Sequence, residues 1–139
     1  MMKYPLFSLL CAILSASAVA DLKKLDGTWK PISGVMGTTH LRKSLLDSMV
    51  LTLKGGRYDY NEGHGHDLGR MKEVGHKAPL GLDIIGTEGP NKGRTFLSIY
   101  KCDGKTLTIC YSTDGKRPTS FDVKGKTTLL LMTYKRTGK

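Results

Sequence analysis

Apolar and polar residues alternate along two runs, Thr95–Tyr100 and Thr106–Tyr111, with a turn signal at Asp103-Gly104 between them. Alternation with a period of two is typical of a strand that buries one face, and Asp-Gly between two such runs predicts a tight hairpin. With Asp103 and Gly104 as a two-residue loop, Cys110 faces Leu97 across the hairpin. One face of the hairpin then carries Phe96, Ser98, Tyr100, Leu107, Ile109 and Tyr111.

Similar short segments fill the rest of the chain. Beyond the hairpin, we expect strands at residues 27–33, 49–53, 57–60, 68–74, 80–85 and 127–134, a short extended piece at 121–123 and one short helix at 41–48. Residues 61–67 have the composition of a turn. Short strands at regular spacing are typical of an antiparallel barrel or sandwich. The sequence therefore predicts an all-β domain with one short helix after the first strand.

The first twenty residues have the layout of a secretory signal peptide. Lys3 gives a positive start, residues 4–16 are mostly apolar, and Ala18-Val19-Ala20 forms a small-x-small site. The apolar stretch is shorter than the roughly 20 residues that a membrane-spanning helix needs, and no later segment is apolar enough to span a membrane. We expect cleavage after Ala20, a mature domain at residues 21–139 and a secreted or periplasmic location.

The chain is strongly basic, with 22 lysines and arginines against 12 aspartates and glutamates and a net charge of +10. The basic residues are spread through the predicted loops, without a block of five or more. Such a surface is either simply solvated or attracts an anionic component of the cell envelope. We expect no nucleic-acid partner, because export argues against one and the sequence contains no recognition helix or base-stacking motif.

Two cysteines, Cys102 and Cys110, follow the predicted cleavage site. Export permits a disulfide, but the hairpin register places the two side chains on opposite faces and several residues apart. A bridge requires Cα atoms closer than about 7 Å. We therefore expect no disulfide between Cys102 and Cys110.

Four stretches of the chain form a recognisable set when taken in order. They are Gly27-Thr28-Trp29; Gly89-Pro90-Asn91-Lys92-Gly93; Ile99-Tyr100 with Asp103-Gly104, Leu107 and Cys110-Tyr111; and Arg117-Pro118-Thr119 with Phe121. Together they resemble a family of exported lipocalin-like domains of uncharacterised function, abundant in planctomycete bacteria. The resemblance covers nearly all of residues 22–136.

This resemblance implies an antiparallel eight-stranded lipocalin-like barrel of the calycin type. It also implies that Trp29 closes one end of the barrel, with a basic residue of the last strand, Arg136 or Lys135, laid over its ring. The family carries no known activity, so no catalytic residue is transferred. We expect no enzymatic activity and no cofactor.

The most chemically suggestive stretch runs from Glu62 to Asp67 and contains His64 and His66. Histidines two positions apart in an extended chain point to the same side, as some zinc sites require. The glycines that flank His64 instead indicate a solvated hairpin loop, and no third ligand occurs at a set spacing. We expect no metal here, and we keep a zinc site at His64 and His66, or an enzyme built on it, as an alternative.

Other catalytic patterns find little support. No Gly-x-Ser-x-Gly elbow occurs, and Asp59, Glu73 and Asp83 have the parity of a solvated strand face. The turn at residues 89–93 is not followed by a helix, so it does not fit a phosphate-binding loop. We expect a rigid turn there, or a basic rim to a pocket formed with Lys92 and Arg94.

Tyr58, Tyr60, Leu82 and Ile84 join the inward face of the hairpin in the expected barrel. Eight strands leave an interior that side chains just fill or that holds one small ligand. The tyrosines and Ser98 would give a pocket polar groups within an apolar lining. The leading hypothesis is an exported binding module for a small hydrophobic or amphipathic ligand. The alternative is an exported structural or interaction protein with a filled core and a basic surface.

Overall fold

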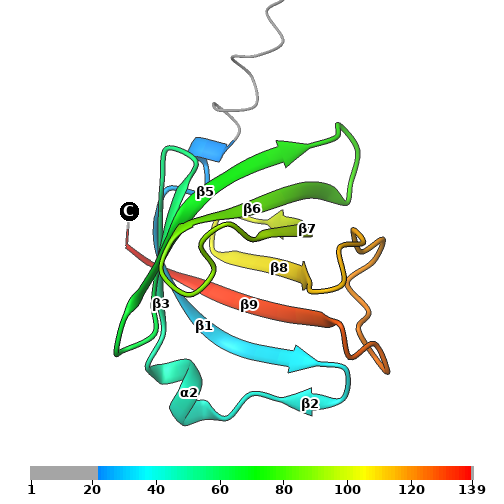
Figure 1. Cartoon of the computed structure of the whole chain (residues 1–139), viewed down its shortest axis with the longest axis horizontal. Coiled ribbons are helices and arrows are strands. Elements are labelled where there is room, and N and C mark those ends of the chain that lie inside the picture. Colours follow the sequence, from blue (N-terminus) through cyan, green and yellow to red (C-terminus); the bar gives the residue numbers. More distant parts are fainter. Residues whose placement is uncertain (1–21, 139) are drawn as a thin grey trace, which may run out of the picture.

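The computed structural model describes residues 22–138, and the predicted signal peptide at residues 1–20 lies outside them. Eight long antiparallel strands follow one another around this part of the chain, and the last pairs with the first to close a barrel (Figure 1). These strands are β1 (Gly27–Met36), β3 (Val50–Lys54), β4 (Arg57–Asn61), β5 (His66–Val74), β6 (Leu80–Glu88), β7 (Thr95–Cys102), β8 (Thr106–Ser112) and β9 (Leu129–Gly138).

The predicted eight-stranded barrel with a short helix after the first strand is therefore confirmed. The two-residue strand β2 (Thr39–His40) and the helix α2 (Lys43–Asp47) lie between β1 and β3. Within residues 22–138, no helix is long and apolar enough to cross a bilayer.

Closure of the barrel depends on β1, which pairs with β3 through its first residues and with β9 along most of its length. Register shifts at Thr28/Trp29 and Pro31/Ser33 interrupt the β1–β9 ladder. Such irregularities bend a strand and increase its twist, and they accommodate a proline that has no N–H to donate. Each of the eight strands consequently has a neighbour on both sides.

The β7–β8 hairpin forms as expected, but its register differs from the predicted one by two residues. Cys110 faces Ile99 rather than Leu97. Because the shift is an even number of residues, every side chain keeps its predicted face. Cys102 and Cys110 lie on opposite faces as free thiols, and the predicted absence of a disulfide between them is confirmed.

The chemistry of the turn explains this shift. The Asp103 carboxylate accepts hydrogen bonds from the backbone N–H groups of Lys105 and Thr106, at 2.9 and 2.7 Å. Asp103 and Thr106 therefore flank the turn, and the two loop residues are Gly104 and Lys105. Gly104 has a φ of 95°, which suits a glycine in the first loop position of a hairpin.

The segment between β8 and β9, residues 113–128, crosses the outside of the barrel as a loop. The extended piece predicted at 121–123 is not a strand, and β9 begins at Leu129. Val123 packs with Ile99, Cys110 and Leu129 in a second apolar cluster on the outer face of the sheet. Cys110 therefore faces outward yet is fully buried, and burial raises the pKa of its thiol.

Trp29 and Arg136 close one end of the barrel. The Trp29 side chain is fully buried, and its indole N–H donates a hydrogen bond to the Leu25 carbonyl oxygen at 2.9 Å. The Arg136 guanidinium lies over the indole, 4.2 Å from the ring centroid. This is the geometry of a cation–π contact.

Arg136 also ties three backbone segments together. Its guanidinium donates hydrogen bonds to the carbonyl oxygens of Lys24, Asp26 and Gly104. The N-terminal turn, the β7–β8 turn and the last strand are thus held by one side chain. Lys135, the other basic residue considered for this position, is exposed.

Replacing Arg136 by alanine should lower the free energy of unfolding by about 2–3 kcal/mol, because it removes three charge-assisted hydrogen bonds and the contact with Trp29. Arg136→Lys should recover only part of this loss, since an ammonium cannot reproduce the planar fork of donors. Lys135→Ala is the matched control and should change stability by less than about 0.5 kcal/mol. Urea denaturation measures all three, and equal effects at the two positions would contradict the assigned role.

Candidate functional site

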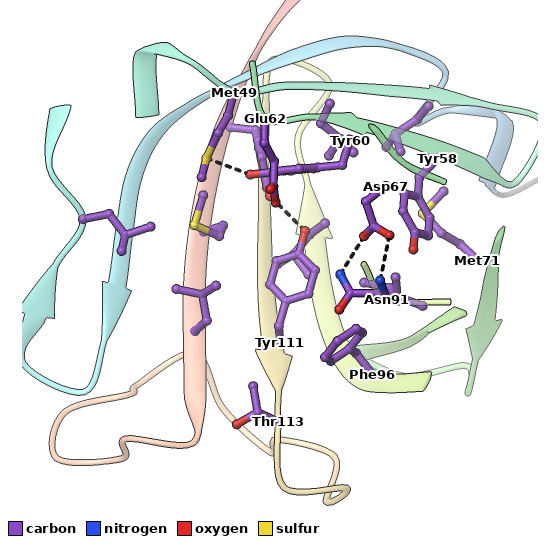
Figure 2. A pocket seen from close by; sticks show the side chains of 18 residues that line it. Met49, Tyr58, Tyr60, Glu62, Asp67, Met71, Asn91, Phe96, Tyr111 and Thr113 are labelled. Atoms are coloured by element: carbon purple, nitrogen blue, oxygen red, sulfur yellow. Dashed lines mark hydrogen bonds between the residues drawn. The ribbon is translucent and has the colours of Figure 1, made fainter. Parts of the chain in front are cut away.

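The barrel interior contains a partly open cavity of about 210 Å³ with a mainly apolar wall. Glu62, Asn91 and Thr113 line it from the loops that follow β4, β6 and β8 (Figure 2). The volume is above the roughly 150 Å³ of a protein cavity that binds benzene. It is below the range of about 300–1,000 Å³ found for drug-sized ligands. The cavity therefore suits a molecule of one ring or a short chain.

Of the ten side chains predicted to line a pocket, six line this cavity. They are Tyr58, Tyr60, Ile84, Phe96, Ile109 and Tyr111. The other four do not line it and are buried in the packed part of the barrel interior. They are Leu82, Ser98, Tyr100 and Leu107. The bulk of Trp29 and its neighbours fills that part, so the interior is packed at one end and hollow at the other.

Four tyrosines, Tyr58, Tyr60, Tyr111 and Tyr134, place hydroxyl groups on the cavity wall. The hydroxyls of Tyr111 and Tyr134 share a hydrogen bond of 2.9 Å, and the Tyr60 hydroxyl donates to the Met49 sulfur at 3.1 Å. Burial is the main cause that raises the pKa of Tyr60 to about 12 and also raises the pKa values of Tyr111 and Tyr134. These side chains are neutral phenols near pH 7 and can donate or accept hydrogen bonds.

The most polar part of the wall is the pair Asp67 and Asn91. Asp67 is buried, with 7% of its surface exposed. Its carboxylate accepts hydrogen bonds from the Asn91 side-chain amide at 2.7 Å and from the Asn91 backbone N–H at 3.3 Å (Figure 2). Asp67 comes from β5 and Asn91 from the β6–β7 loop, so the pair joins two separate elements across the cavity wall.

The Tyr58 hydroxyl lies beside this pair and is buried without a hydrogen bond of standard geometry. Tyr58 pairs across the sheet with Gly69, and a Cβ on Gly69 would lie 2.4 Å from the Tyr58 ring. The glycine thus leaves the space that the ring occupies. Burial, then the nearby charge of Asp67 and a hydrogen-bonding interaction with its carboxylate, raise the pKa of Tyr58 to about 12. The cavity therefore contains a buried hydroxyl next to a buried carboxylate.

Sequence reasoning missed Asp67, Asn91 and Tyr134. The segment at 61–67 reads as a turn, but β5 already begins at His66, so His66 points outward and Asp67 inward. Asn91 belongs to the expected rigid turn at 89–93, and no local signal shows that this turn folds onto β6. The one sign of this packing in the sequence is Gly86. A Cβ on this residue would lie 2.0 Å from the Asn91 carbonyl oxygen, so a glycine lets the turn pack closely against β6.

The two histidines of the stretch from Glu62 to Asp67 lie outside the cavity. His66 Nδ1 is 2.6 Å from an oxygen of Asp59, and both side chains are exposed. His64 is exposed in the β4–β5 loop. In the described part of the chain, no group of three or more His, Cys, Asp or Glu residues is placed to hold a metal ion. The zinc hypothesis for His64 and His66 stays a prediction.

Two carboxylates that the sequence assigned to a solvated face have partners instead. Asp83 forms a salt bridge of 2.5 Å with Arg117, which reaches over from the β8–β9 loop. Glu73 accepts a hydrogen bond from the Tyr100 hydroxyl. Both contacts join β5 or β6 to other elements, and neither carboxylate lines the cavity.

No family model, curated protein or solved structure matches this chain. The function is therefore inferred from the geometry of the cavity. Membership of the lipocalin-like family suggested by the four sequence stretches stays a prediction.

Replacing Asn91 by alanine should lower the free energy of unfolding by about 1–3 kcal/mol, because it leaves a buried Asp67 oxygen without its shorter hydrogen bond. Lys92→Ala, in the same loop but exposed, should change stability by less than about 0.5 kcal/mol. Urea denaturation of both variants is the measurement. An Asn91→Ala protein as stable as Lys92→Ala would mean that the pair does not hold the loop.

Proposed function

We propose that this protein is an exported binding module, without catalytic activity, that holds one small hydrophobic or amphipathic molecule in the barrel cavity. The observation that carries the proposal is a mainly apolar cavity in a barrel whose opposite end is closed by Trp29. Sites for small molecules typically combine an apolar lining with a few placed polar groups. The phenols and the pair Asp67–Asn91 are such groups.

The lining is also suited to binding because most of it belongs to strands. Ile84, Phe96 and Ile109 lie on three adjacent strands and point to the same face. A cavity that is held open by its scaffold loses little conformational entropy when a ligand enters. This supports a binding role more directly than a filled-core structural role.

Other parts of the hypothesis have separate support. Export rests on the signal-peptide layout of residues 1–20. An anionic envelope partner rests on the net charge of +10, and it is compatible with a ligand in the cavity. The zinc-dependent alternative has weaker support, since His66 is engaged by Asp59 on the outer surface.

A panel of small apolar compounds no larger than naphthalene, screened by two-dimensional NMR, tests the proposal. We expect binders whose shift changes concentrate on cavity residues. Ile84→Trp should weaken their binding by about tenfold or more, since the indole occupies space that the ligand needs and a loss of about 1.4 kcal/mol is tenfold.

The control is Ile85→Trp, which places the same side chain on the outward face of the same strand. It should leave the affinity of each binder unchanged. Thermal melts of both variants show whether each is folded. A panel without binders, or equal weakening by the two substitutions, would contradict a ligand site in the barrel.

A further inference from the structure

The charge of the cavity is opposite to that of the protein. The chain has 22 basic and 12 acidic residues. Within residues 22–138, the side chains that line the cavity include two carboxylates, Glu62 and Asp67, and no lysine, arginine or histidine. Arg94 lies over the Phe96 ring at 5.0 Å, but it is exposed and is not part of the lining. The basic residues are thus excluded from the cavity of a basic protein.

Asp67 lacks a cationic partner in the described part of the chain, where the salt bridges are formed by other acids. Its two hydrogen bonds both come from Asn91, and the one from the backbone is long, at 3.3 Å. A carboxylate has about four acceptor positions, so Asn91 leaves about half of them open, and Tyr58 is the side chain next to these. Burying an ionised carboxylate is costly unless a charge or further hydrogen bonds compensate it.

Tyr58 gives a second sign of a missing group beside Asp67, the side chain with which it interacts most directly. Its hydroxyl is buried without a hydrogen bond of standard geometry, and the residue is only 7% exposed. Buried polar atoms nearly always have a partner. Figure 2 shows Tyr58 beside Asp67 and Asn91 in the cavity wall. A ligand group placed here would meet an anionic acceptor and a hydroxyl oxygen together.

We propose that the cavity selects a small amphipathic cation, an apolar molecule that carries a primary amine, and that Asp67 is the anchor of its ammonium group. This inference rests on the proposed binding function. An ammonium has three donors and no acceptor, which complements the open carboxylate positions of Asp67 and the oxygen of Tyr58. The apolar body of the ligand then lies against Ile84, Phe96 and Ile109.

The remaining electrostatics agree with this choice. Glu62 places a second negative charge on the wall, and the faces of tyrosine rings attract cations. An anionic ligand would meet two carboxylates and no basic side chain. The positive outer surface opposes a cation only weakly, because exposed charges are screened beyond about 8 Å at physiological salt.

Three compounds with one skeleton test the inference: 2-phenylethylamine, 2-phenylethanol and 3-phenylpropanoate. Their dissociation constants are measured by NMR titration of the purified protein at neutral pH and physiological salt. We expect the amine to bind on the order of ten- to a hundredfold more tightly than the alcohol, the range for a hydrogen bond to a charged group. The carboxylate should bind most weakly.

Asp67→Asn should abolish the preference for the amine over the alcohol. Asp59→Asn is the matched control, because Asp59 is an aspartate on the neighbouring strand that points outward to His66. It should keep the full preference. Tyr58→Phe leaves the bonds between Asp67 and Asn91 in place and should weaken amine binding several-fold. If Asp67→Asn fails to fold, Tyr58→Phe and the selectivity of the unchanged protein decide the question.

The outcomes separate this inference from the proposed function. If the alcohol or the carboxylate binds as tightly as the amine, the amine preference is wrong and the binding function stands. The same holds if none of the three binds while other apolar compounds bind in the cavity. If no compound of any charge binds there, the proposed function and this inference fail together.

Discussion

The contact between Arg136 and Trp29 is the interaction on which the architecture depends. It joins the last strand to the first, with the guanidinium 4.2 Å from the indole ring centroid. Arg136 also donates hydrogen bonds to backbone carbonyl oxygens of the N-terminal turn and the β7–β8 turn. One end of the barrel is therefore packed solid. The space that side chains do not fill lies toward the other end, beside the loops that follow β4, β6 and β8.

The chemistry of that hollow end follows from which strand residues point inward. Inward positions of β4, β8 and β9 supply phenols that burial keeps neutral. The inward position of β5 supplies Asp67, and the β6–β7 loop folds back to pair Asn91 with it. Glycines create the space for this arrangement: Gly69 lies under the Tyr58 ring, and Gly86 lies under the Asn91 backbone. The result is an apolar cavity with one polar, negatively charged wall.

The sequence predicted the fold well, because alternation with a period of two identifies strand faces directly. It predicted six lining residues for the same reason, and the hairpin error did not matter because a shift of two residues preserves the face. It failed where placement depends on the third dimension. Asp67 looks like part of a polar turn, Asn91 like part of a rigid loop, and Tyr134 has no assignable face until β9 is paired with β8. Which end of the barrel is filled depends on the bulk of Trp29. The alternation of apolar and polar residues along the strands does not show this.

The central claim is that the hollow end of the barrel holds a small molecule. Native mass spectrometry of the protein isolated from its own source tests this most directly, with the same protein loaded with 2-phenylethylamine as a control for survival of the complex. We expect a one-to-one noncovalent adduct of a small compound that is released when the protein is unfolded. A bare protein mass, under conditions in which the control complex survives, would contradict the claim.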